Sequence, residues 1–402
     1  MRKLFLLLLV ISSSLACQNV TDTFVYRAST DTLTNKTFDT AGTSNVTGTG
    51  ILDITKSPYN CLDGRDCTTG IRQALSDCVN GGAIYIPPVT TGFILSGSGV
   101  DRGDGTMTLL LSTKQCSILG SNGTKSRLVV ASSVANTVDV LTISPAVGAA
   151  YQELTLKDFA IVEQSGNPGR DAIVVYMPGA SQLVQYMHTI GVRTGYGLTG
   201  RSFRAVNPTK NPDALVLSQW VRNVFPGGIK TDIISDSGII DGNVFPVGGP
   251  NNVAIDLNIY HGSSSWMISN NNATMNGGFL RLRGGQQVNL VNNQVELLNA
   301  INTTEQPSSG LIVFEGSSST IHGGRVMGGN ISTNANAANG IVIDRASGII
   351  IDGVQIGKGS KNHIYLTSSS SNACIRQNNY DVSAVILDQG TNNRIAGTGL
   401  GC

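Results

Sequence analysis

The feature that most constrains the fold is an apolar anchor that returns every 21 to 31 residues, with no helical pattern between copies. Each anchor opens an inward–outward–inward triplet, and a second strand-like run follows it after a turn. The nine anchors are Ile173, Leu198, Ile229, Ile255, Leu280, Leu311, Ile341, Ile364 and Val385. A period in the twenties built from strands alone is typical of a β-solenoid, in which stacked coils share one core.

Gly or Asn recurs at the turn inside the second run of each copy, at Gly242, Asn270, Asn292, Gly323 and Gly353. Both residues suit left-handed turn backbones, and stacked Asn side chains can form amide ladders. Crossovers between parallel strands are right-handed as a rule. We therefore predict an all-β chain that forms a right-handed, single-stranded parallel β-helix.

One amphipathic helix precedes the repeats, at about residues 67–80. Asp66 or Thr68 can cap its start, and Gly81 with Gly82 ends it. Its apolar face combines Ile71, Ala74, Leu75, Cys78 and Val79. The exposed end of a solenoid invites edge pairing, so we expect this helix to cap the N-terminal end of the β-helix.

The N-terminus predicts export. Residues 1–16 combine a basic start, an apolar run and small residues, as a secretory signal peptide does. Cleavage after Ala16 makes Cys17 the first residue, which resembles the lipid attachment site of bacterial lipoproteins, and no other membrane attachment is predicted. Residues 17–58 form a Thr/Asn-rich segment, and residues 59–402 the β-helix domain. The expected location is extracellular or at the cell surface.

The cysteines fit an oxidising compartment. There are seven, and six remain if Cys17 is lipidated or lost. Cys61, Cys67 and Cys78 cluster near one end of the predicted fold, and Cys374 and Cys402 near the other, so we expect disulfides that staple the ends. The connectivity stays open.

Charge excludes one class of partner. The chain has 27 Lys and Arg against 26 Asp and Glu, and only 13% of its residues are charged. A protein that tracks nucleic-acid phosphates needs a basic stripe, so no nucleic-acid partner is expected.

Two segments carry resemblances. Asp66 to Pro88, with its helix, Gly pair and YIPP strand, resembles the opening of β-helix domains of the pectate-lyase superfamily. Thr30 to Asn45, which contains TLTNKT, is similar to segments of phage tail fibres and tailspikes. The first resemblance implies a polysaccharide ligand, and the second implies a virion location as the alternative and leaves a homotrimer open. The polygalacturonase pattern of paired aspartates with Gly-His-Gly is missing from the sequence.

Charged residues gather on the outward face of the middle coils. The residue after each anchor gives one outward column, with Lys230, Asp256 and Arg281 in successive coils. A second column, two residues further on, contains Tyr176, Arg201, Asp232, Asn258, Arg283 and Phe314. We predict Asp232, Asp256, Arg281 and Arg283 as catalytic residues, because a lyase needs a base and a cation and a hydrolase needs two carboxylates.

The predicted substrate-binding residues surround this group: Lys230, Asn258, Tyr260, Arg201, Phe314 and Tyr176. Asp232 and Asp256 could instead hold Ca²⁺, and otherwise no cofactor is expected. Glu315, Asp344 and Arg345 form a second acidic candidate. The alternative interpretation is that these charges are ladders that pair across strands and keep the outer face soluble.

Two functions therefore remain open. One is a polysaccharide lyase or glycosidase. The other is a non-catalytic tail fibre, tailspike or adhesin that binds a cell-surface glycan.

Overall fold

The structure, a computed structural model, describes the chain from residue 50 onward, with internal gaps. The predicted signal peptide, Cys17, Leu198, Tyr260 and Cys402 lie outside the described residues. The described ranges are 50–146, 148–164, 170–179, 181–195, 200–210, 215–232, 237–246, 252–259, 264–275, 277–297, 301, 303–304, 310–318, 320–332, 339–357 and 361–396.

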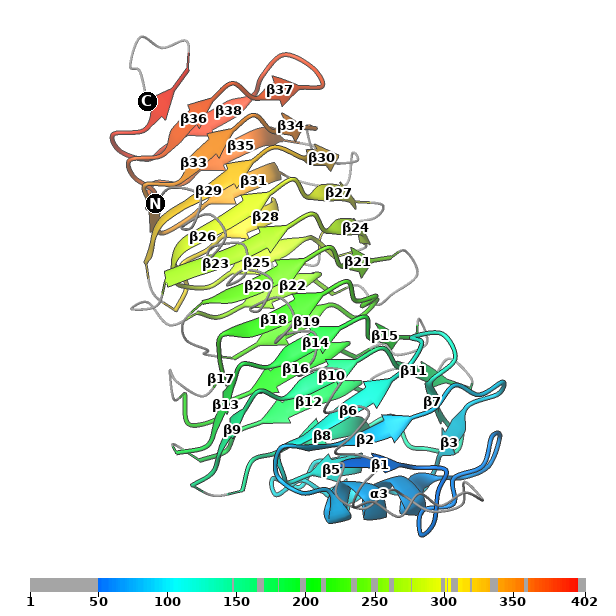
Figure 1. Cartoon of the computed structure of the whole chain (residues 1–402). Coiled ribbons are helices and arrows are strands. Elements are labelled where there is room, and N and C mark those ends of the chain that lie inside the picture. Colours follow the sequence, from blue (N-terminus) through cyan, green and yellow to red (C-terminus); the bar gives the residue numbers. More distant parts are fainter. Residues whose placement is uncertain are drawn as a thin grey trace, which may run out of the picture.

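Successive coils add strands to the same sheets, which run along the length of the molecule (Figure 1). Every described strand pairing is parallel except that of β4 (Val100–Asp101) with β5 (Met107–Ser112). Strands that follow one another along a sheet come from different coils, which confirms the predicted parallel β-helix. The longest sheet, here called sheet 1, contains β1 (Ile51–Asp53), β2 (Gly82–Ile86), β6 (Cys116–Gly120), β10 (Thr155–Lys157), β14 (His188–Ile190), β18 (Ser218–Val221), β20 (Gly238–Asp241), β23 (Ser264–Ser269), β26 (Gln286–Val291), β29 (Ile321–Met327), β32 (Ala346–Ser347), β33 (Ile350–Asp352), β36 (Cys374–Arg376) and β39 (Arg394–Ile395).

The other sheets complete each coil. Sheet 2 contains β21 (Val244–Phe245), β24 (Asn272–Met275), β27 (Gln294–Leu297), β30 (Asn330–Ser332), β34 (Gln355–Ile356) and β37 (Asn379–Tyr380). Sheet 3 contains β4, β5, β8 (Asp139–Ile143), β12 (Ile173–Tyr176), β16 (Phe203–Val206), β19 (Ile229–Thr231), β22 (Ile255–Leu257), β25 (Leu280–Leu282), β28 (Gly310–Phe314), β31 (Asn339–Ile343), β35 (Asn362–Leu366) and β38 (Ile386–Asp388). Two short sheets serve the earlier coils: β3 (Phe93–Leu95), β7 (Arg127–Val130), β11 (Ala160–Glu163) and β15 (Arg193–Thr194), and then β9 (Ala150–Gln152), β13 (Leu183–Gln185) and β17 (Leu215–Val216). β1 comes from the stretch that the sequence assigned to the N-terminal segment.

Helix α3 (Thr68–Asp77) lies at the end of the stack beside β5 and β1, in the expected capping position (Figure 1). Asp66 Oδ1 accepts a hydrogen bond from the backbone N–H of Thr68 at 3.0 Å. The helix ends at Asp77, earlier than predicted, because Cys78 leaves helical geometry and forms a disulfide with Cys116. Val79, predicted on the apolar face, is therefore 60% exposed.

The inward triplets lie on sheet 3. Six of the predicted anchors occupy one column of aligned, buried residues: Ile173, Ile229, Ile255, Leu280, Ile341 and Ile364. The column continues through Phe203, Ile312 and Ile386, so the anchors placed at Leu311 and Val385 were wrong by one residue. The strand Gly310–Phe314 is buried at every position, so no alternation marks its inner face.

The turns inside the second strand-like runs have the predicted left-handed backbone. Gly242, Asn270, Asn292, Gly323 and Gly353 all have φ between 53° and 67°. The amide ladder is built by the neighbouring buried residues Asn223, Asn243, Asn271 and Asn293. Each of the first three bonds to the side-chain oxygen of the next, through its backbone N–H and its amide. The ladder ties four coils together at the corner between sheets 1 and 2.

At the N-terminal end of the β-helix, the expected disulfides form only in part. Cys78 and Cys116 form a disulfide, while Cys61 and Cys67 are free buried thiols that interact with each other. Cys374 is also disulfide-bonded. Within the described ranges, no helix has the length and apolar character to cross a membrane.

Candidate functional site

The predicted charged column lies on the outer face of sheet 3, where β19, β22 and β25 are neighbours. Lys230 aligns with Asp256, and Asp256 aligns with Arg281. The three side chains therefore stack as plus, minus, plus, about 4.8 Å apart. Sequence spacing alone located this column, because these three coils have regular lengths.

Asp256 is the buried centre of the cluster, with no exposed surface. Arg283 Nε donates to its Oδ1 at 2.9 Å, and Lys230 Nζ lies 3.8 Å from its Oδ2. Burial raises the pKa of Asp256, and the cations around it, Arg283 first, oppose that rise. The buried carboxylate of Asp256 thus orients the side chains of Arg283 and Lys230, which lie closer to the surface. Arg283 is fixed further by a 2.7 Å hydrogen bond to the carbonyl of Thr231.

Arg281 forms a second ion pair with Glu315. Its guanidinium donates to both carboxylate oxygens, with 2.9 Å between Nη2 and Oε1. Burial alone would raise the pKa of Glu315, but the hydrogen bonds from Arg281 hold it below its usual value. Glu315, which the sequence placed in a separate acidic group, therefore belongs to the cluster.

The cationic side chains of this cluster are more exposed than the anionic ones. The side chains of Lys230, Arg283 and Arg281 are 31%, 17% and 16% exposed, whereas those of Asp256 and Glu315 are 0% and 7% exposed. The accessible ends of these ion pairs are therefore the cations. Such a surface favours an anionic group that approaches from outside.

Two acceptors in the cluster lack hydrogen bonds. Within the described part of the chain, Asp256 Oδ2 and Asn258 Oδ1 are buried and have no hydrogen-bond donor. Buried polar atoms usually find a partner, so these two oxygens mark a place where a donor fits. Asp232, half-buried beyond the end of β19, accepts the N–H of Asn207 at 3.2 Å, and its charge is one of those that raise the pKa of Arg204.

Of the remaining predicted ligand residues, Phe314 and Tyr176 are not gathered here, whereas Arg201 is buried but its charge still opposes the rise in the pKa of Asp256. Phe314 is fully buried and aligns with Leu282 in the core, so it does not face outward as predicted. Arg201 is 5% exposed and donates to the carbonyl of Val253 at 2.7 Å. Tyr176 is 3% exposed, with Arg102 over its ring at 4.7 Å. A one-residue error in the repeat moved Phe314 into the wrong column, and a five-residue error moved Arg201, because Phe203 aligns with Ile173 and Ile229 in that coil.

Sequence reasoning missed a carboxylate pair on earlier coils of the same sheet. Asp139 Oδ1 accepts the backbone N–H of Asp171 at 3.1 Å. Arg102 bonds to Asp139 at 3.0 Å and Arg204 to Asp171 at 3.1 Å. Burial, followed by the charge of Asp171, raises the pKa of Asp139 to about 6. Asp139 and Asp171 each lie two residues before an inward anchor, Leu141 and Ile173. Extending the sequence repeat toward the N-terminus by one coil would have shown this pattern.

No metal centre is evident in the ranges that the structure describes, where no three acidic, His or Cys side chains come together to hold an ion. The cations around Asp256 also oppose a bound cation there. Ca²⁺ stays a prediction of the sequence.

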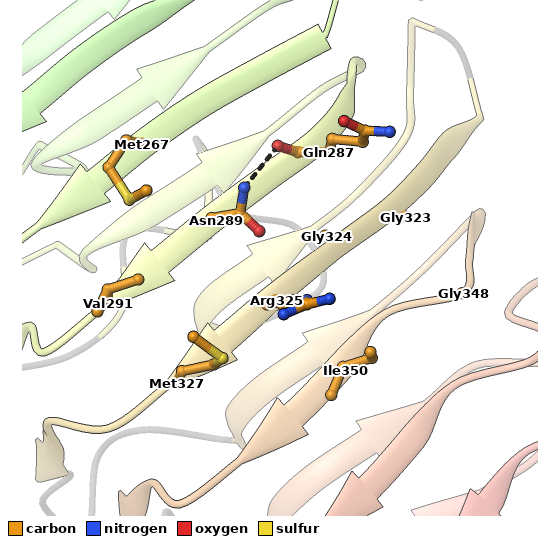
Figure 2. Close-up of a pocket in the computed structure, with 10 residues that line it drawn as sticks. All are labelled: Met267, Gln287, Asn289, Val291, Gly323, Gly324, Arg325, Met327, Gly348 and Ile350. Carbon is orange, nitrogen blue, oxygen red and sulfur yellow. Dashed lines mark hydrogen bonds between the residues drawn. The ribbon is translucent and has the colours of Figure 1, made fainter. Parts of the chain in front are cut away.

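The outer face of sheet 1 carries a separate cavity of about 550 Å³. Figure 2 shows its lining, with Met267, Asn289, Arg325 and Ile350 projecting from four neighbouring strands. Cavities of about 340 and 260 Å³ continue it along the same sheet in both directions. The sequence analysis did not find this groove, because its walls come from residues of many coils.

No protein-family model matches the chain. No curated protein matches it either. Solved structures do resemble it. The DFA-IIIase of Arthrobacter chlorophenolicus A6 without its lid is 13% identical, with 87% of this chain and 99% of that chain covered and a TM-score of 0.48. The A-module of mannuronan C-5 epimerase AlgE6 of Azotobacter vinelandii is 11% identical, with coverage of 84% and 79% and a TM-score of 0.46.

A phage protein gives a similar result. Tailspike protein 2 of Escherichia coli O157:H7 bacteriophage CAB120 is 14% identical, with 83% of this chain and 40% of that chain covered and a TM-score of 0.46. At these identities the likeness concerns the fold. The chain shares the parallel β-helix architecture with these proteins.

Proposed function

We propose that this protein is an exported β-helix protein that binds an acidic polysaccharide through the charged cluster on sheet 3. The observation that carries the proposal is the separation of charge by depth. Lys230 reaches the surface from the coil before that of Asp256, and Arg281 and Arg283 from the coil after it, while Asp256 and Glu315 lie buried beneath them. A sugar carboxylate meets cations that are already held in place, so little side-chain entropy is lost on binding.

The geometry supports binding better than hydrolysis. A glycosidase needs two carboxylates that reach the glycosidic bond from opposite sides. In this cluster Asp256 and Glu315 are both buried and engaged by arginines. Both carboxylates therefore act on Arg283 and Arg281, and through them on a ligand. We thus favour the non-catalytic of the two functions expected from the sequence.

The test is to titrate the mature protein with uronate polymers (polygalacturonate, alginate and hyaluronate) in a calorimeter. Fully methyl-esterified polygalacturonate is the matched neutral ligand. Lys230→Gln should weaken binding of the charged polymer about tenfold, the equivalent of roughly 1.4 kcal/mol for one charge-assisted hydrogen bond. Lys157→Gln, an exposed lysine on sheet 1, is the control and should bind like wild type.

Two results would overturn the proposal. One is unchanged affinity of the Lys230→Gln variant for every uronate polymer that the wild type binds. The other is the steady appearance of unsaturated uronate absorbance or of reducing ends, which would make the protein an enzyme.

A further inference from the structure

The three cavities on sheet 1 form one groove. Met267 lines both the 340 Å³ and the 550 Å³ cavity, and Gly348 and Ile350 line both the 550 Å³ and the 260 Å³ cavity. The groove crosses eight neighbouring strands, from β18 to β39. At ~4.8 Å per strand, seven intervals give a length of about 34 Å parallel to the solenoid axis. An extended polymer fits this shape better than a compact ligand does.

Glycines replace side chains in the lining of the 550 Å³ cavity. Gly323 and Gly348 occupy, in adjacent coils, the left-handed position that Gln287 fills one coil earlier and Asn372 one coil later. No side chain projects into the groove at these two places. Figure 2 shows both glycines along one side of the cavity lining, on the side where Gln287 lies.

The charged residues in the groove lining disfavour a cationic ligand. Among the residues that the structure describes, none that lines the three cavities is acidic, and three are arginines: Arg325, Arg376 and Arg394. Arg376 is paired with Asp352 at 2.9 Å. Arg325 is exposed and has no ion-pair partner among the residues that the structure describes. The electrostatic complement of this surface is therefore an anion.

The other lining groups suit sugar rings. Amide side chains such as Gln219, Gln287 and Asn289 both donate to and accept from hydroxyls. Met267, 38% exposed, and Ile350 offer apolar contact to the C–H faces of a ring.

Two other kinds of polymer fit less well. The backbone groups in the middle of sheet 1 are already bonded to neighbouring coils, so a peptide cannot add as a strand there. Single-stranded nucleic acid needs several aromatic platforms for its bases. The described part of the groove lining contains one aromatic residue, Tyr186.

We propose that the groove on sheet 1 binds a linear anionic polysaccharide along the solenoid axis, at a site separate from the charged cluster on sheet 3. The proposal does not depend on that cluster, because no residue is shared between the two places. Affinity should rise with the length of the polymer until the chain spans the groove. Loss of the anionic groups should weaken binding.

A matched pair of substitutions tests the proposal. Gly348→Gln places in the gap the residue type that Gln287 holds in the same column, with φ of 48°. The nearest heavy atoms to a Cβ at Gly348 are 3.8 Å away, so no clash arises, and the backbone strain of a side chain at φ of 72° is matched in the control at φ of 64°. The control is Gly353→Gln, outside the groove, in the column where Gln377 has φ of 53°. A Cβ at Gly353 meets nothing within 4 Å.

The variants are made in the Lys230→Gln background and titrated with polygalacturonate oligomers of increasing length. Gly348→Gln and Arg325→Gln should each lower the affinity for long oligomers about tenfold or more, while Gly353→Gln stays within twofold. Equal affinity of the Gly348→Gln and Gly353→Gln variants would refute the groove as the site. Self-association by light scattering that Gly348→Gln abolishes, without oligomer binding, would refute it in favour of an interface between copies. Preferential binding of a single-stranded oligonucleotide would refute it as well.

Because the sheet 3 cluster is already impaired in this background, the two proposals fail separately. If Lys230→Gln alone has no effect but Gly348→Gln abolishes binding, the groove stands and the cluster does not.

Discussion

Replacing Asp139 by asparagine should make the protein more stable at neutral pH. Asp139 is buried beside Asp171, and its pKa is raised from 3.8 to about 6. Between these two values the folded state binds more protons than the unfolded state, so stability falls as the pH rises. Above pH 6 the ionised Asp139 lowers the free energy of unfolding by the full amount, about 3 kcal/mol for a shift of roughly two pKa units at 1.36 kcal/mol each.

Asparagine removes this penalty but weakens one ion pair. Its side-chain oxygen can still accept the N–H of Asp171, as Asp139 Oδ1 does at 3.1 Å. The 3.0 Å contact with Arg102 loses its charge, but the attraction of Arg102 is already included in the pKa of about 6, and Arg102 keeps its other partner, Asp104. We therefore expect a net gain of up to about 3 kcal/mol at pH 7 and no gain below pH 4.

Urea unfolding between pH 4 and 8 measures the effect, with hydrogen exchange of peptides from β8 and β12 as the local probe. Asp104→Asn is the matched control, because burial alone would raise the pKa of Asp104 but its hydrogen bonds from Arg102 and Thr106 lower it. That variant should be less stable than wild type at pH 7, and the difference should shrink as the pH falls. If Asp139→Asn instead destabilises at pH 7 and leaves the pH slope unchanged, the reasoning about this pair is refuted.

Three further predictions concern the fold and export. Asn271→Ala removes the acceptor of the buried Asn243 amide and should destabilise the protein by about 2–4 kcal/mol in urea unfolding. Cys78→Ala opens the disulfide with Cys116, which spans 38 residues, and should cost about 4 kcal/mol in the chain-entropy model, measured against oxidised wild type, with reduced wild type as the control that should lose a similar amount. Mass spectrometry of the chain from its native host should show Cys17 as the first residue, and a retained Met1 would contradict the predicted export.

Much of the fold was determined by the sequence alone. The regular spacing of Ile229, Ile255 and Leu280 placed three coils in register, because a side chain must recur once per coil to meet its neighbour in the core. The Gly and Asn turns followed from their tolerance of positive φ. The charged column followed as well, since the residue after each buried anchor must face outward.

Other features were decided only by the tertiary structure. In Gly310–Phe314 every residue is buried, so the sequence carries no alternation that tells the inner face from the outer one. The pairing of Arg281 with Glu315, 34 residues apart, depends on side-chain reach between coils and not on spacing. In the groove on sheet 1, the lining residues Gly323 and Gly348 are neighbours in adjacent coils. Coil stacking brings such residues together, and their separation along the chain gives no local signal of it.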